Sequence, residues 1–127
     1  MSELLVVEDD FALGVFLVQA LERDAIPYRV AQNGEVALQF AAECWPAAVL
    51  LDLTLPGDLD GWQVWDKLLS QAGGRALRVI LFAAELDSHD QRQAHQREAW
   101  AVLRKPVSRA RLMDHVRRAL AEAAIHV

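Results

Sequence analysis

The sequence has a single cysteine, no broad basic stretch and no long hydrophobic run. A lone Cys44 excludes an internal disulfide and a metal site built from cysteines, and we expect its side chain to be a small buried apolar group. Lys and Arg number 13 against 18 Asp and Glu, so the formal net charge is -5 and no basic field faces a phosphate backbone. We therefore expect no direct nucleic-acid partner.

Membrane and secretion signals are also missing. No apolar stretch has the length of a membrane span, and the N-terminus lacks the basic start and small-residue cleavage pattern of a secretory signal. The sequence therefore predicts a cytoplasmic protein without a membrane segment. With 127 residues, 54% of them hydrophobic, the chain has the size of one compact domain with a full core, and we predict a single domain over residues 1–127.

The chain alternates between segments typical of buried strands and segments typical of amphipathic helices. The predicted strands are Leu4–Val7, Tyr28–Ala31, Ala47–Leu51, Leu77–Phe82 and Trp100–Leu103. The predicted helices are Phe11–Arg23, Asn33–Glu43, Trp62–Gln71, a weaker one at Asp87–Glu98, and one capped by Ser108 that runs to about Ala124. This order predicts an α/β fold, a flavodoxin-like doubly wound (βα)5 arrangement with a five-stranded parallel sheet of strand order 2-1-3-4-5.

Three of the predicted strands end in charged residues. Carboxyl ends of parallel strands meet at the edge of the sheet where doubly wound folds bind ligands. We therefore expect several carboxylates and one ammonium to share a pocket there. The charged segments are Glu8-Asp9-Asp10 after the first strand, Asp52 after the third and Arg104-Lys105-Pro106 after the fifth.

Such a cluster of oxygens predicts a divalent cation, Mg²⁺ or Mn²⁺. Mg²⁺ prefers octahedral oxygen coordination and typically takes one or two protein carboxylates plus substrate oxygens, which Asp9 and Asp52 can supply. Several carboxylates in one cleft also raise at least one pKa, and Lys105 is the counter-charge that limits the repulsion.

Simpler structural roles explain some of the acidic residues. Asp10 precedes an apolar-periodic run and is expected to cap that helix, while Asp58 and Asp60 lie in a turn-rich loop. Asp52 could cap the loop that follows it, but that role leaves Lys105 and the first acidic pair unexplained. None of the histidines has metal-ligand spacing to a second ligand, so we expect surface positions for His89, His95, His115 and His126.

The charged segments closely resemble the motifs of the receiver domains of two-component response regulators. The resemblance covers the whole chain. The three motifs are specific when they occur together and in this order, and they are the acidic pair in Val6-Val7-Glu8-Asp9-Asp10, the phosphoacceptor motif in Leu51-Asp52-Leu53-Thr54-Leu55-Pro56 and the Lys-Pro motif in Leu103-Arg104-Lys105-Pro106.

The resemblance implies a role for each site residue. Asp52 would accept a phosphoryl group from a histidine kinase or a histidine phosphotransfer protein. Asp9, assisted by Glu8, would hold the cation together with the Asp52 carboxylate and the backbone carbonyl of Thr54. Lys105 would pair with the phosphoryl group. Enzymatic activity would be limited to self-phosphorylation from phosphodonors and autodephosphorylation.

Two positions depart from the receiver pattern. Receivers usually carry a Ser or Thr hydroxyl after the fourth strand and a Tyr or Phe in the fifth, whereas this chain has Ala83 and Val102. In the usual arrangement the hydroxyl moves toward the phosphoryl group and the aromatic ring fills the vacated space. Ala83 and Val102 cannot make that exchange. The loop from Pro56 to Gly61 also looks one residue longer than in the common form.

Three functions follow from these observations. The leading hypothesis is a stand-alone receiver that takes a phosphoryl group on Asp52 and signals by contact with a downstream protein target, with the last helix-strand-helix face as a candidate homodimer surface. The alternative is a protein-binding module of receiver fold that ignores phosphorylation, which Ala83 and Val102 favour. A phosphohydrolase is weaker, because Thr54 stands where that chemistry usually needs a second acidic residue.

Overall fold

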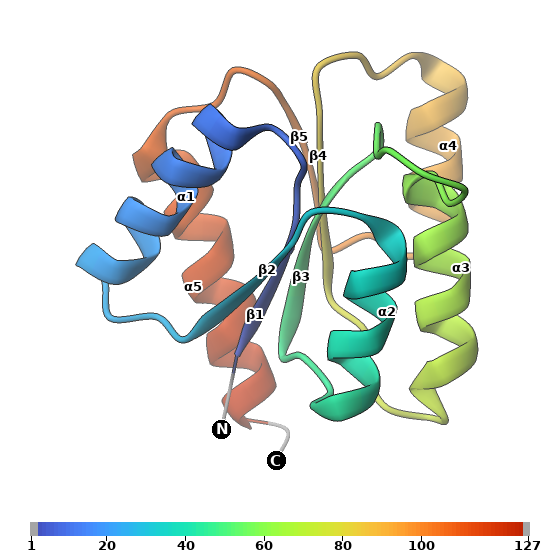
Figure 1. Cartoon of the computed structure of the whole chain (residues 1–127), viewed down its shortest axis with the longest axis horizontal. Helices are drawn as coiled ribbons and strands as arrows, with labels where there is room; N and C mark the ends of the chain where they lie inside the picture. Colours follow the sequence, from blue (N-terminus) through green and yellow to red (C-terminus); the bar gives the residue numbers. More distant parts are fainter. Residues whose placement is uncertain (1–2, 126–127) are drawn as a thin grey trace.

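The computed structural model describes residues 3–125, in which strands and helices alternate as predicted (Figure 1). The strands are β1 (Leu4–Val7), β2 (Tyr28–Ala31), β3 (Ala48–Asp52), β4 (Val79–Ala83) and β5 (Ala101–Arg104). The helices are α1 (Phe11–Arg23), α2 (Gly34–Glu43), α3 (Gly61–Ala72), α4 (Ser88–Gln96) and α5 (Arg109–Ile125).

All neighbouring strands pair in parallel, and the sheet has the order β2-β1-β3-β4-β5. This confirms the predicted flavodoxin-like topology. Helices α1 and α5 cover one face of the sheet, and α2, α3 and α4 cover the other (Figure 1). Because every strand runs in the same direction, the segments that follow β1, β3 and β5 all emerge at one edge.

Each face of the sheet has its own hydrophobic core. On one face, Leu5, Val7, Leu51 and Leu81 pack with Trp65 of α3. The other face uses the alternate strand positions, which pack against α1 and α5 and include Leu4, Leu50, Ile80, Leu17 and Leu112. β1, β3 and β4 are buried throughout, whereas β5 at the sheet edge is exposed at alternate positions.

Short polar side chains start the helices. Asp10, Asn33, Asp60 and Asp87 accept hydrogen bonds from backbone N–H groups of the first turns of α1, α2, α3 and α4, respectively. The Ser108 hydroxyl accepts one from Arg111 N at the start of α5. The predicted caps at Asp10 and Ser108 are therefore confirmed.

The predicted element ends differ from the structure by one or two residues. The sheet ladder pairs Asp52 with Phe82 and Ala83 with Arg104, so β3, β4 and β5 each run one residue further than their apolar segments. Helix α4 is shorter than predicted. Asp87 caps it rather than belonging to it, and Glu98 has a φ of 58°, which is not helical.

The prediction that Cys44 is buried is wrong. Its thiol is exposed, because Cys44 follows the last turn of α2 with an extended backbone and no longer lies on the inward face of the helix. Among the histidines, His89 and His95 are exposed and His115 is half-buried, while His126 lies outside the described residues. Within residues 3–125, no helix is long and apolar enough to cross a membrane.

Candidate phosphoacceptor and metal site

Three carboxylates meet at the carboxyl edge of the sheet. Glu8 and Asp9 follow β1, and Asp52 is the last residue of β3. One carboxylate oxygen from each lies within 4.8 Å of the others. Glu8 is 3% exposed and Asp52 5%, whereas Asp9 is exposed to solvent. The structure thus brings together the acidic residues that the strand ends predicted, two of them buried and one open to water.

Lys105 connects the two buried carboxylates. Its Nζ donates to Glu8 Oε2 and to Asp52 Oδ2, each at 3.2 Å. The ammonium also lies 5.0 Å from the centre of the Phe82 ring. Lys105 reaches this position from the residue after β5, so two strand ends separated by β4 are joined by one side chain.

The pKa of Glu8 is shifted by its surroundings in this site. The pKa of Glu8 is raised from 4.5 to about 7, chiefly because burial disfavours its charged form and also because the Asp52 carboxylate lies next to it. Lys105 opposes this shift but does not cancel it. Without an added cation, the site therefore has too little positive charge for its carboxylates at neutral pH.

These donors fit a hard divalent cation. They are oxygens only, two are fixed by burial and the third faces solvent, which leaves room for the waters that Mg²⁺ retains. Thr54 lies two residues after the end of β3, and its N–H donates to Asp52 Oδ1 at 3.2 Å, which orients the Asp52 carboxylate. Outside this cluster, Asp10 and Asp60 cap helices, and Asp58 is an exposed loop residue.

Gly61 supports the site and was missed by the sequence reasoning, which treated it only as part of a turn. It begins α3, and its N–H donates to Leu53 O at 2.9 Å. A Cβ at this position would lie 2.6 Å from both Asp52 O and Leu53 Cα, closer than side chains approach backbone. Only glycine lets α3 start this close to the backbone of Asp52 and Leu53. The adjacent Asp60 cap was the available signal.

Within residues 3–125, the side of the edge formed by β4 and β5 has no cluster of carboxylates like the one at β1 and β3. Ala83 is buried at the end of β4, and Val102 in β5 is 36% exposed. Opposite Ala83 in the ladder lies Arg104, whose Nη2 donates to Leu86 O at 2.6 Å. Helix α4, which follows, buries only Ala94.

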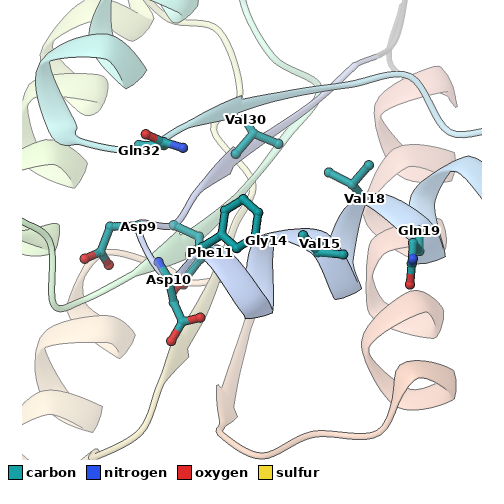
Figure 2. Close-up of a pocket in the computed structure, with 10 residues that line it drawn as sticks. Asp9, Asp10, Phe11, Gly14, Val15, Val18, Gln19, Val30 and Gln32 are labelled. Atoms are coloured by element: carbon teal, nitrogen blue, oxygen red, sulfur yellow. The ribbon is translucent and has the colours of Figure 1, made fainter.

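A mainly apolar pocket of about 270 Å³ opens beside the acidic residues. Figure 2 shows its walls, with Phe11 and Val15 on α1 and Val30 on β2. Phe11 is 80% exposed although it directly follows Asp10. A large unpaired aromatic ring next to a charged site is typical of a surface that another protein covers.

Comparison with known proteins identifies the family. The response regulator receiver domain model matches residues 4–117. The response regulator PleD of Caulobacter vibrioides is 33% identical over 118 residues, which are 92% of this chain and 26% of PleD. The transcriptional regulatory protein SrrA of Staphylococcus aureus is 40% identical over 67 residues, 53% of this chain and 27% of that protein. The chain thus corresponds to about a quarter of these relatives.

Solved structures agree with this match. The receiver domain of the sensor histidine kinase PA1611 from Pseudomonas aeruginosa, with magnesium coordinated in its active-site cleft, is 26% identical with a TM-score of 0.83, over 94% of this chain and 98% of that one. A CheY-like receiver from Methanospirillum hungatei, at 21% identity, shares the fold with a TM-score of 0.89, over 100% of this chain and 99% of that one. The chain therefore belongs to the response regulator receiver domains of two-component signalling.

Proposed function

We propose that this receiver accepts a phosphoryl group on Asp52 from a histidine kinase or a histidine phosphotransfer protein, in the presence of Mg²⁺ or Mn²⁺, and signals through protein contacts. One observation carries the proposal. The buried Asp52 carboxylate accepts from the Lys105 ammonium at 3.2 Å and lies within 4.8 Å of Glu8 and Asp9 oxygens, with which it can hold a cation. A single domain over residues 1–127 and a cytoplasmic location are parts of the same proposal.

The proposed transfer is a substitution at phosphorus. An oxygen of the Asp52 carboxylate attacks, the phosphorus–nitrogen bond of the partner's phosphohistidine breaks, and the nitrogen keeps the electron pair. Thr54 N–H holds Oδ1 and Lys105 holds Oδ2, so the carboxylate is oriented before the partner arrives. Glu8, Asp9, Asp52 and the Thr54 carbonyl would hold a Mg²⁺ ion, which would neutralise charge on the phosphoryl oxygens. Lys105 then pairs with the new phosphoryl group.

The partner that delivers the phosphoryl group needs a surface next to Asp52. The pocket formed by Phe11, Val15 and Val30 begins at Glu8 and Asp9, so a protein seated there would bring its histidine to the acceptor. We assign this pocket and the exposed Phe11 ring to the phosphodonor partner. Replacing Phe11 with Ser should slow transfer from a phosphorylated partner and leave transfer from a small phosphodonor unchanged.

The test of the proposal is intact-mass analysis after incubation with Mg²⁺ and acetyl phosphate. We expect one phosphoryl adduct, absent in Asp52→Asn and absent from a metal-free sample. A wild-type protein that gains no mass from acetyl phosphate, and none from a histidine kinase, would contradict it.

The alternative is a binding module of receiver fold that ignores phosphorylation. The buried Ala83 and the exposed Val102 favour it, because the usual hydroxyl and aromatic ring are missing. Titration with beryllium fluoride, an analogue of the phosphoryl group, separates the two. A phosphorylation-independent module would bind its protein partner equally well with and without the analogue.

A further inference from the structure

We propose that Arg104 takes over the task of the missing switch residues. In the resting protein its guanidinium holds the loop between β4 and α4, and in the phosphorylated protein it leaves the loop and donates to the phosphoryl group on Asp52. This inference rests on the proposed function.

The position of Arg104 carries the first step. It is the ladder partner of Ala83, the residue that stands where receivers usually have a hydroxyl. Paired residues on neighbouring parallel strands point to the same face of the sheet. Ala83 belongs to the core under α2, α3 and α4, so Arg104 projects to that face and lies beside the missing hydroxyl.

The contact with Leu86 carries the second step. Arg104 Nη2 donates to Leu86 O at 2.6 Å, while Lys105 N donates to Ala83 O at 2.8 Å, so the end of β5 holds both ends of the loop. In the part of the chain that the structure describes, no other hydrogen bond reaches residues 84–86. Helix α4 follows this loop and buries only Ala94, and its first turn is closed by a capping box between Asp87 and Asp90. The Arg104 contact adds to this by fixing the carbonyl of Leu86, two residues before α4 begins.

The third argument is the charge of the Arg104 guanidinium and of the phosphorylated site. Within residues 3–125, Arg104 forms no ion pair and its charged donor is bound to a neutral carbonyl. A bond from guanidinium to a phosphoryl oxygen joins two opposite charges and can be bidentate, whereas the bond to Leu86 O has only one charged partner. With one Mg²⁺, three carboxylates and the Lys105 ammonium have no formal net charge, and a phosphoryl group in place of the Asp52 charge adds roughly one negative charge. That excess attracts the nearby guanidinium.

Reach is the remaining requirement. Lys105, the next residue, already extends from the end of β5 across β4 to Asp52. Arg104 starts on the opposite face from Asp52 and Phe82, so its guanidinium would have to turn over the end of β4, and arginine has a longer side chain than lysine for this turn. The same movement would free Leu86 O, so the loop would loosen when the site is charged.

The experiment measures beryllium fluoride affinity, in the presence of Mg²⁺, and amide hydrogen exchange of α4 in the same proteins. For Arg104→Ala we expect about tenfold weaker affinity, the value of one charge-assisted hydrogen bond. Arg104→Lys, which keeps the charge, should lie between this variant and the wild type. Arg92→Ala is the matched control, since the guanidinium of this exposed arginine on α4 makes no side-chain hydrogen bond or ion pair among the described residues.

Hydrogen exchange separates the proposed movement from a purely structural role. In the wild type, beryllium fluoride should speed exchange in residues 91–97. Arg104→Ala should exchange fast without the analogue and change little when it is added. An Arg104→Ala variant that binds the analogue and responds to it like the wild type would overturn the inference alone. A wild type that binds no beryllium fluoride, or binds it equally in Asp52→Asn, would overturn the proposed function and the inference with it.

Discussion

Two parts of the same sheet edge are built in different ways. At the ends of β1 and β3, Glu8 and Asp52 are buried and are tied together by Lys105. At the ends of β4 and β5, a single side-chain hydrogen bond from Arg104 reaches a loop that leads to a polar helix. The first part has many mutually dependent contacts, and the second has few. In this structure the acidic cluster and the loop after β4 are therefore held by separate contacts.

The largest effect on stability is expected from Gly61→Ala, which tests how rigidly α3 is held against the end of β3. The added Cβ would lie 2.6 Å from Asp52 O, and backbone atoms cannot yield cheaply, so the free energy of unfolding should fall by about 3 kcal/mol. Urea unfolding measures this. Gly14→Ala is the control: no atom lies within 4 Å of its new Cβ, and an alanine within α1 should add about 0.5–1 kcal/mol. Equal stability of the two variants would refute the close approach.

The second prediction uses pH to test the charge balance of the acceptor part. The pKa of Glu8 is raised to about 7 in the folded protein from 4.5, so folding favours its protonated form. Its stabilising contribution is complete below pH 4.5 and is lost as the pH rises through 7, by an amount on the order of 2 kcal/mol. Thermal unfolding of the metal-free protein should show this loss, which Glu8→Gln should abolish. An identical pH profile in both proteins would show that Glu8 is not the group responsible.

The third prediction concerns the end of β4, where Ala83→Thr would add a polar side chain to the part of the edge that has few polar contacts. The new hydroxyl would be buried. Without the analogue it has no hydrogen-bond acceptor there, so we expect it to reduce the free energy of unfolding by about 1–2 kcal/mol. With Mg²⁺ and beryllium fluoride present, it should donate to the analogue and increase its affinity severalfold. Isothermal titration measures the affinity. Ala84→Thr, at an exposed position, serves as the control, and a gain of affinity there of the same size would rule out the hydroxyl's position as the cause.

The smallest effect is expected at the far end of α4. Arg97 donates to both carboxylate oxygens of Asp66 and lies over the Trp62 ring at 4.9 Å. Arg97→Ala should cost about 1 kcal/mol of unfolding free energy and increase hydrogen exchange in α4, while phosphoryl uptake stays unchanged. Arg118→Ala removes only an exposed pair on α5 and should cost less. A loss of phosphoryl uptake in Arg97→Ala would show that this contact at α4 also affects the chemistry at Asp52.

The same Arg97 contact adds a pH dependence of opposite sign. The hydrogen bond from Arg97 lowers the pKa of Asp66. The contribution of Asp66 to the free energy of unfolding is therefore present above pH 3.8 and is lost as the pH falls through the lowered pKa. Acid unfolding of Arg97→Ala should lack this component.

Most of the fold was predictable because its signals are local and repeated. Apolar runs and helical spacing located all ten elements, and parallel strand ends predicted that Glu8, Asp52 and Lys105 would meet. Element ends were less accurate, since β3 gains Asp52 only through its ladder with Phe82.

Three features were not predictable for a common physical reason. The need for glycine at position 61 is a distance between α3 and β3, the Arg104 contact depends on which carbonyl the loop presents, and the exposure of Cys44 depends on where α2 ends. Each depends on how two segments of the chain are placed relative to one another, and the hydrophobic periodicity of neither segment reveals that placement. Such features become visible only when the elements have been packed together.

The exposed Cys44 thiol makes the molecule easy to observe. It lies where α2 ends, at the opposite edge of the sheet from Asp52, because α2 runs back from the carboxyl ends of the strands. The chain has no other cysteine, so a maleimide dye or a nitroxide would attach at one place without mutagenesis. A label there stands apart from the acidic residues and from Phe11, and its tumbling rate would report when a second protein joins this receiver.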